Sequence, residues 1–178
     1  MRTLWVVRHG ETVWNAEHRL TGWSDPPLSQ RGEEQARSLR SLLTSEVFDA
    51  VWSSDLVRAL RTAELAWGEA RGDHRLREID FGELDGADWR TLDARWRDLL
   101  LQDFDRFQAP QGEHASEFTR RVVEFVEQLP PGRHLVFSHG GVLRLLLRLL
   151  GQDQFLPNAS VARILWDRRE VVHILRGE

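Results

Sequence analysis

The chain has 178 residues, of which 41% are hydrophobic and 29% charged, an ordinary composition for a globular protein with a sizeable core. Its formal net charge of −4 provides no overall basic field for a nucleic-acid backbone, so any anion site must be local. No apolar run approaches the ~20 residues of a membrane span. The sequence also shows no signal peptide, so we expect a cytoplasmic protein.

Cysteine and lysine are both absent, and all 24 basic residues are arginines. The lack of cysteine excludes disulfides, thiolate catalysis and Cys-ligated zinc. The lack of lysine excludes a Walker-type phosphate loop and Schiff-base chemistry. Recognition of a phosphate or carboxylate must therefore use histidine or arginine, whose planar guanidinium suits both anions.

The N-terminal half alternates short apolar runs with amphipathic segments. Residues Leu4–Val7 predict a buried strand. Ser29 is the predicted N-cap of a helix with apolar residues at helical spacing up to Leu43. Ala50–Trp52 predicts a second strand, and Asp55 is the predicted N-cap of the helix that follows it.

The C-terminal half contains longer helical patterns. The segment Asp88–Phe104 carries Trp and Leu residues at helical spacing and predicts one helix. Another helix is predicted to start at Ser116 and to stop before Pro130. Leu135–Phe137 predicts a buried strand, and the helix directly after it has Gly151 as its predicted C-cap.

Two further strands are predicted at Val161–Trp166 and Val171–Leu175, on either side of a hairpin turn at Asp167–Glu170. This alternation of strands and helices predicts an α/β fold, with a doubly wound, mostly parallel sheet between two layers of helices. No linker or repeat interrupts the chain, so residues 1–178 are expected to form a single domain. The helical stretch 83–114 has no flanking strands and is predicted to lie over the sheet as a lid.

Basic side chains follow three of the predicted strands at the point where each strand ends. The first strand leads into Arg8 and His9, the second into Arg58, and the third into His139. Ligands of open parallel sheets bind outside the carboxyl ends of the strands, so these four side chains should converge. Arginines and histidines together favour a phosphoryl group, and a neutral imidazole among them can act as its nucleophile.

Phosphoryl transfer also needs an acid that protonates the leaving oxygen. The segment "LREIDFGELDG" offers several carboxylates, of which Glu78 and Asp80 would share one face of an extended chain. Their spacing leaves both as candidates. No metal site is expected, because the chain lacks an HExxH motif and the PCxxC partner of a zinc deaminase. Trp14 and Trp23 are predicted to flank the site.

Six blocks of the sequence, in this order, resemble the histidine phosphatase superfamily. The resemblance is to its phosphoglycerate-mutase-like branch, which contains small-molecule phosphatases that need no cofactor. The blocks are "VVRHGETVWN", "LTGWSDPPLSQRGEEQA", "VWSSDLVRALRTAE", "LREIDFGELDG", "PQGEHASEF" and "VFSHGGVLR". One position departs from the family pattern, since His114 stands where the family usually has serine.

The resemblance implies a role for each matching residue. It makes His9 the nucleophile that becomes phosphohistidine and Glu78 the proton donor. The residues implied to bind the phosphoryl group are Arg8, Asn15, Arg58 and His139. Those implied to border the substrate elsewhere are Thr21, Gly22 and Gly140. The implied fold is a sheet of about six strands, mostly parallel with an antiparallel edge.

The implied activity is hydrolysis of a small phosphorylated metabolite, without metal, cofactor, nucleic-acid or membrane partner. One alternative that the resemblance leaves open is a phosphoglycerate mutase, although the family's mutases look longer than this chain and need a bisphosphate primer. Another is a phosphate-binding module without catalysis, but His9 and Glu78 are both present here. Proteins of similar sequence act on different phosphorylated metabolites, so the motifs identify neither the substrate nor the oligomeric state.

Overall fold

A computed structural model describes all 178 residues, and its centre is one six-stranded sheet with the order β3-β2-β4-β1-β5-β6. The strands are β1 (Arg2–Arg8), β2 (Ala50–Ser53), β3 (Arg71–Gly72), β4 (Gly132–Ser138), β5 (Val161–Leu165) and β6 (Glu170–Leu175). Strands β1 to β4 run parallel, whereas β5 is antiparallel to β1 and β6 is antiparallel to β5. The predicted mostly parallel sheet with an antiparallel edge is therefore confirmed.

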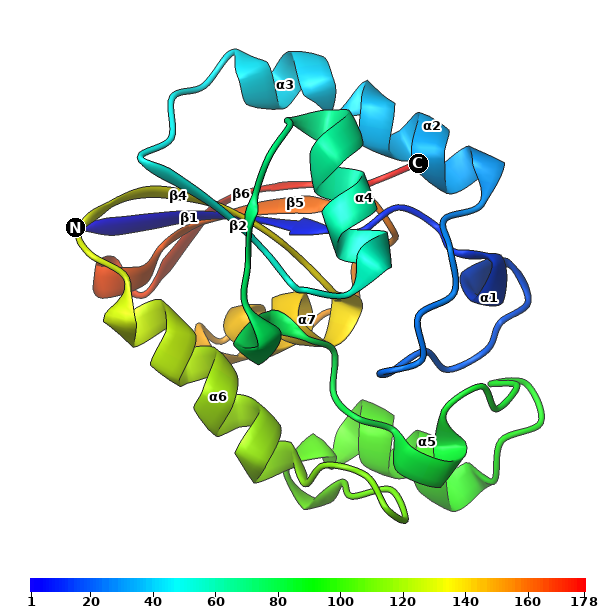
Figure 1. Cartoon of the computed structure of the whole chain (residues 1–178). Coiled ribbons are helices and arrows are strands. Elements are labelled where there is room, and N and C mark those ends of the chain that lie inside the picture. The colour runs from blue at the N-terminus through cyan, green and yellow to red at the C-terminus, as the bar shows by residue number, and fades with distance from the viewer.

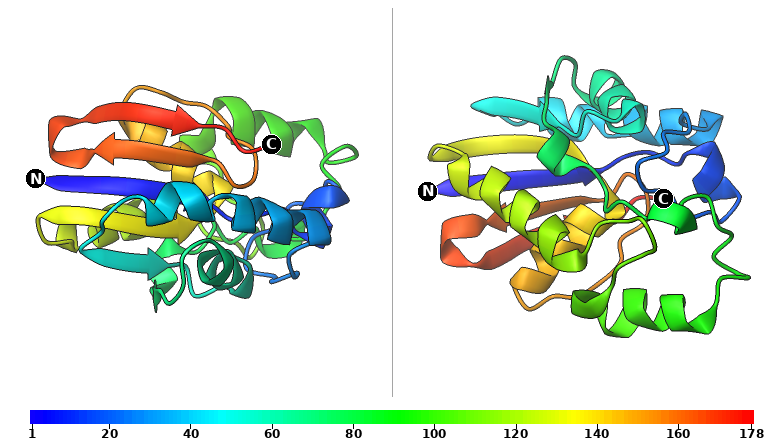
Figure 2. Two further views of the ribbon diagram at one scale, coloured as in Figure 1. Left: turned by 90° about the horizontal axis from the view of Figure 1, so that it is seen from above. Right: turned by 60° about the horizontal axis from the view of Figure 1, so that its bottom comes forward.

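Helices lie on both faces of this sheet. They are α1 (Val13–Ala16), α2 (Gln30–Ser38), α3 (Arg40–Thr44), α4 (Val57–Ala66), α5 (Ala94–Gln102), α6 (Ala115–Gln128) and α7 (Gly140–Leu149). Figure 1 shows α2, α3 and α4 over one face and α6 and α7 over the other, and the views in Figure 2 agree. None of these helices is both long and apolar enough to cross a membrane.

Strand β1 shows why its sequence is a continuous apolar run. Leu4 and Val6 belong to the larger buried cluster, together with side chains of α6 and α7. Trp5 and Val7 belong to the smaller cluster, together with side chains of α3 and α4. Successive residues of a strand point to opposite faces, and here both faces are covered by helices, so every position is apolar.

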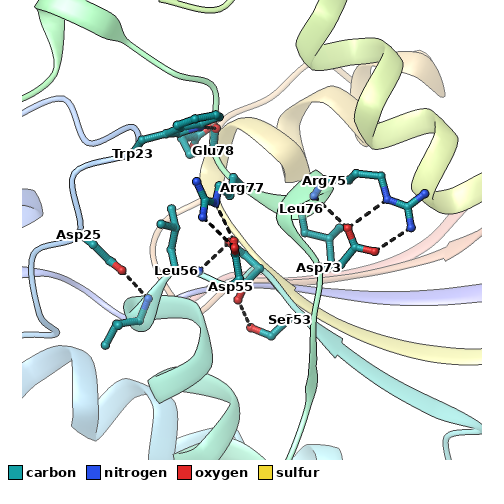
Figure 3. Close-up of polar contacts among 12 residues, drawn as sticks. Trp23, Asp25, Ser53, Asp55, Leu56, Asp73, Arg75, Leu76, Arg77 and Glu78 are labelled. Carbon is teal, nitrogen blue, oxygen red and sulfur yellow. Dashed lines mark hydrogen bonds and ion pairs between the residues drawn. The ribbon is translucent and has the colours of Figure 1, made fainter.

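The predicted N-cap of α4 is wrong. The helix begins after Leu56, and no side chain of the N-cap residue bonds to it. The Asp55 carboxylate instead accepts two hydrogen bonds of 2.7 Å from the Arg77 guanidinium (Figure 3). Asp25, from a distant loop, accepts the free Val57 N–H. A tertiary contact has thus taken the capping role that local sequence assigned to Asp55.

The predicted helix at Asp88–Phe104 is shorter than expected, since α5 covers only Ala94–Gln102. Three backbone hydrogen bonds join residues 86–89 to residues 18–20, so this part of the chain pairs with another loop rather than with itself. The region 83–114 therefore holds α5 and short 3₁₀ turns rather than one long helix. It lies beyond the carboxyl ends of the strands, near α7 (Figure 1).

Other boundaries differ by smaller amounts. Ser29 caps α2 as predicted, but the helical stretch that follows is interrupted at Leu39 and continues as α3. Helix α6 begins one residue before Ser116, and His114 is its N-cap, with Nδ1 accepting the Ser116 N–H at 3.0 Å. Gly151 follows the end of α7 with a φ of +79°, as expected for a helix C-terminus. The predicted strand that ends at Trp166 stops at Leu165.

Candidate active site

Strand β1 ends near the middle of the sheet edge and leads into His9 and Gly10. The His9 N–H donates to the Ser138 carbonyl at 2.9 Å, and the Ala159 N–H donates to the His9 carbonyl at 3.1 Å. Gly10 is packed so closely that an added Cβ would lie 2.3 Å from the Gly32 carbonyl oxygen. Only glycine fits there, and the backbone that carries His9 is held from several sides.

The imidazole of His9 is buried, with 4% of the residue exposed. Its Nδ1 lies 2.7 Å from the Gly10 carbonyl oxygen, which can only accept a hydrogen bond. Nδ1 therefore carries the ring proton, and Nε2 keeps a free lone pair. Burial, and then the charges of Arg58 and Arg8, hold the pKa of His9 well below its usual value. His9 is thus a neutral imidazole suited to nucleophilic attack through Nε2.

Buried polar atoms without a partner gather around His9. Six buried side-chain nitrogens in the protein lack a hydrogen-bond partner, and three of them are Arg8 Nε, Arg58 Nε and His139 Nδ1. The His139 ring is 5.2 Å from that of His9, and both arginines lower the His9 pKa. Buried polar atoms normally have partners, so this cluster indicates a place for an anion.

His139 is oriented by Ser54, a residue that the sequence did not single out. Ser54 Oγ accepts the Leu56 N–H at 3.3 Å and lies 2.8 Å from His139 Nε2. When the serine hydroxyl donates to Nε2, the ring proton of His139 lies on Nδ1. The unpartnered Nδ1 is then a hydrogen-bond donor, as a phosphoryl oxygen requires.

Arg58 is fully buried in the first turn of α4 and anchors a neighbouring loop. Its two terminal nitrogens donate to the carbonyls of Gly22 at 2.6 Å and Ser24 at 2.8 Å, and one of them pairs with Asp25 at 3.2 Å. Only Nε is left without a partner. Arg58 therefore holds the loop at residues 22–25 and still offers one donor beside His9.

Glu78, rather than Asp80, enters the site. Its Oε1 accepts the Ile79 N–H at 2.9 Å, and its Oε2 accepts the Gly141 N–H at 2.8 Å. Burial raises the pKa of Glu78 despite these two donors and the charges of Arg58 and Arg8. Asp80 turns away and accepts the Gly82 N–H at 2.9 Å. Burial thus favours the protonated form of Glu78, as a proton donor requires.

Gly141 makes room for this carboxyl group, and its replacement tests the arrangement. A Cβ at Gly141 would lie 2.0 Å from Glu78 Oε1. We expect Gly141→Ala to displace Glu78 and to lower kcat/KM at least about tenfold for a substrate whose leaving group needs a proton. Gly72→Ala is a suitable control for the loss of a glycine, since an added Cβ there makes only ordinary contacts with Asp55, at 3.6 Å and beyond. Equal activity in both variants would contradict the assigned position of Glu78.

Asn15 reaches the site from α1. Its Oδ1 accepts the Thr12 N–H and the Asn158 side-chain N–H, both at 3.1 Å, which leaves its own amide nitrogen as a donor. Asn158 also donates to the His9 carbonyl at 3.1 Å, so it connects Asn15 with the nucleophile. No motif or spacing in the sequence pointed to Asn158.

These groups border a cavity of about 420 Å³, within the usual range for small-molecule sites. Of the nine predicted site residues, six line it: Arg8, His9, Asn15, Thr21, Glu78 and Gly140. Arg58 and His139 lie fully buried behind this surface, and Gly22 is turned away to hold Arg58 and Asp85. The remaining lining is largely apolar and comes from α5, α7 and their loops.

Trp14 and Trp23 were predicted to flank the site, and neither of them lines the cavity. Trp14 packs against Gly86, and the Trp23 indole N–H donates to the Glu78 backbone carbonyl at 3.0 Å, with the Arg77 guanidinium 4.9 Å from its ring (Figure 3). His114 also lies outside the lining and acts as the cap of α6.

Comparisons with known proteins agree with this geometry. The sequence profile of the histidine phosphatase superfamily (branch 1) matches residues 4–176. An Escherichia coli protein named "Probable phosphoglycerate mutase GpmB" is 36% identical and matches over 99% of this chain and 90% of its own.

Two solved structures have the same fold. The structure of a phosphoglycerate mutase from Thermus thermophilus superposes with a TM-score of 0.91 at 48% identity, over 97% of this chain and 98% of its own. That of a "putative alpha-ribazole-5'-P phosphatase" from Escherichia coli gives a TM-score of 0.80 at 30% identity, over 98% of this chain and 96% of its own. The chain therefore belongs to the histidine phosphatase superfamily, branch 1.

Proposed function

We propose that this protein is a phosphatase that hydrolyses a small phosphomonoester through a phosphohistidine on His9, without a metal or cofactor. The observation that carries the proposal is the neutral, buried His9 with a free Nε2, beside Arg8, Arg58 and His139, each of which has an unpartnered buried nitrogen. A nucleophile and a set of donors for phosphoryl oxygens thus occupy one site.

In the first step, His9 Nε2 attacks phosphorus and the bond from phosphorus to the ester oxygen breaks. Arg8, Arg58, His139 and the Asn15 amide stabilise the charge on the phosphoryl oxygens during the transfer. Glu78 gives its proton to the leaving oxygen, so a neutral alcohol departs and a carboxylate remains. The raised pKa of Glu78 keeps that proton available.

In the second step, the Glu78 carboxylate takes a proton from a water molecule, whose oxygen attacks the phosphohistidine. The bond from phosphorus to Nε2 breaks, inorganic phosphate forms, and both residues return to their initial protonation states. Leu101 and Phe155, which line the cavity, are 43% and 52% exposed, so the cavity is open to solvent. Access of water favours hydrolysis over transfer to a second substrate.

A phosphoglycerate mutase is the second candidate, and the names of two relatives favour it. Both activities would share the phosphohistidine, and they differ in the acceptor of the second step. Phenyl phosphate with a chelator present tests the first proposal, and we expect continuous release of inorganic phosphate. Interconversion of phosphoglycerates only after priming, with no net phosphate release from phenyl phosphate, would overturn the proposal in favour of the mutase.

A further inference from the structure

The part of the cavity that faces away from the phosphoryl donors is lined by apolar side chains. Nine of the 19 residues that line the whole cavity are hydrophobic, and they include the aromatic rings of Phe81, Trp89, Phe104 and Phe155. Phe81 and Phe104 also pack against the buried Phe107, with centroid separations of 5.9 and 6.2 Å. This wall is therefore formed before any ligand binds, and it would contact the leaving group of a phosphomonoester held at His9.

Three arginines also line this part of the cavity, and each is paired with a carboxylate. Arg19 lies 2.7 Å from Glu17. Arg144 lies 2.6 Å from Asp153. Arg148 lies 2.7 Å from Asp105, which itself does not line the cavity.

Of the three arginines, Arg144 makes the most contacts within the protein. Its remaining nitrogens donate to the carbonyls of Leu100 and Leu101 at the end of α5. Its guanidinium carbon is 4.0 Å from the centroid of Phe155. Arg144 thus holds α5 and Phe155 in place. All three arginines in this part of the cavity are paired, so it contains no unpaired cation.

Building on the proposed function, we propose that the substrate is a monoester of an uncharged alcohol that bears an aromatic group. A ring would replace water against the aromatic wall, which is favourable. A second anion in the leaving group, such as a carboxylate, would lose its hydration without meeting an unpaired cation.

The first test compares substrates that differ in one property. Benzyl and ethyl phosphate both release a simple alcohol on hydrolysis, and we expect a higher kcat/KM for the benzyl ester. Phosphates of 3-hydroxybenzamide and 3-hydroxybenzoate differ mainly in charge, and we expect a kcat/KM about tenfold lower for the carboxylate, which corresponds to ~1.4 kcal/mol. Equal values within either pair would overturn the inference and leave the proposed phosphatase intact. No turnover of any of the four esters would contradict the proposed function itself.

The second test exposes one of the paired cations. Asp105→Asn removes the nearer partner of Arg148 and leaves only a 3.9 Å contact with Asp153, so we expect the kcat/KM ratio of the carboxylate to the amide substrate to rise severalfold. Asp103→Asn is the matched control, since Asp103 pairs at 3.2 Å with Arg106, which lies outside the cavity lining. The same ratio in wild type and Asp105→Asn, or the same rise in both variants, would show that pairing of Arg148 does not set the selectivity.

Discussion

Replacement of His9 by alanine is expected to reduce phosphate release from phenyl phosphate by a factor on the order of 10⁴ or more. The reason is that Nε2 of His9 is the only protein atom that forms a bond to phosphorus in the proposed mechanism. Steady-state release of phosphate measures the loss. His173→Ala is the matched control, because this histidine is exposed on β6 and does not line the cavity.

The phosphoenzyme gives an independent measure of the same role. A radiolabelled monoester should transfer its phosphoryl group to the wild-type protein, in a bond that is labile to acid and stable to alkali. His9→Ala should acquire no label, although its thermal unfolding should show that it is folded. Undiminished turnover in His9→Ala, or a label recovered on it, would mean that the nucleophile is another residue.

Glu78→Gln is expected to affect substrates according to their leaving groups. For benzyl phosphate, whose alkoxide needs a proton, we expect kcat/KM to fall by roughly 10² to 10⁴. For 4-nitrophenyl phosphate the leaving group departs readily as an anion, and the loss should be far smaller. Asp80→Asn is the control, because it keeps the oxygen that accepts the Gly82 N–H. An equal loss for both substrates would contradict the role of Glu78 as the acid.

The pH dependence follows from the same two residues. The attacking His9 must be neutral, and since its pKa is depressed, this condition still holds in mildly acidic solution. Glu78 must be protonated, and since its pKa is raised, kcat/KM for benzyl phosphate should fall as the pH rises through that pKa. With 4-nitrophenyl phosphate this alkaline decline should be absent. The same alkaline decline for both esters would point to a different titrating group.

Much of the fold follows from local patterns. The apolar runs at the positions of β1, β2 and β4 predicted buried strands, because strands covered on both faces have no polar side. Arg8, His9, Arg58 and His139 were expected to converge because each follows a parallel strand, and the structure brings them together around one point. Helix boundaries were less predictable. Asp55 has the residue type of an N-cap, yet its carboxylate is bound to Arg77.

The supporting residues of the site were not predictable in this way. Ser54, Gly141 and Asn158 act through contacts with residues more than 60 positions away in the chain, and nothing in their local sequence indicates those contacts. The same holds for the cavity wall. Trp14 and Trp23 are close in sequence to the site residues but point elsewhere, whereas Trp89 and Phe155 line the cavity from distant segments.

By itself, then, the sequence determined the α/β class and the convergence of Arg8, His9, Arg58 and His139 at one edge of the sheet. Strand periodicity is a local property, and parallel strands bring their carboxyl ends to one edge whatever the rest of the chain does. Three features were decided only by tertiary structure. They are the position of Glu78 rather than Asp80 in the site, the neutral tautomer of His9, and the pairing of the arginines in the cavity lining with carboxylates. Each of them depends on burial and on atoms from distant segments, and these set pKa values and the environment of a ligand.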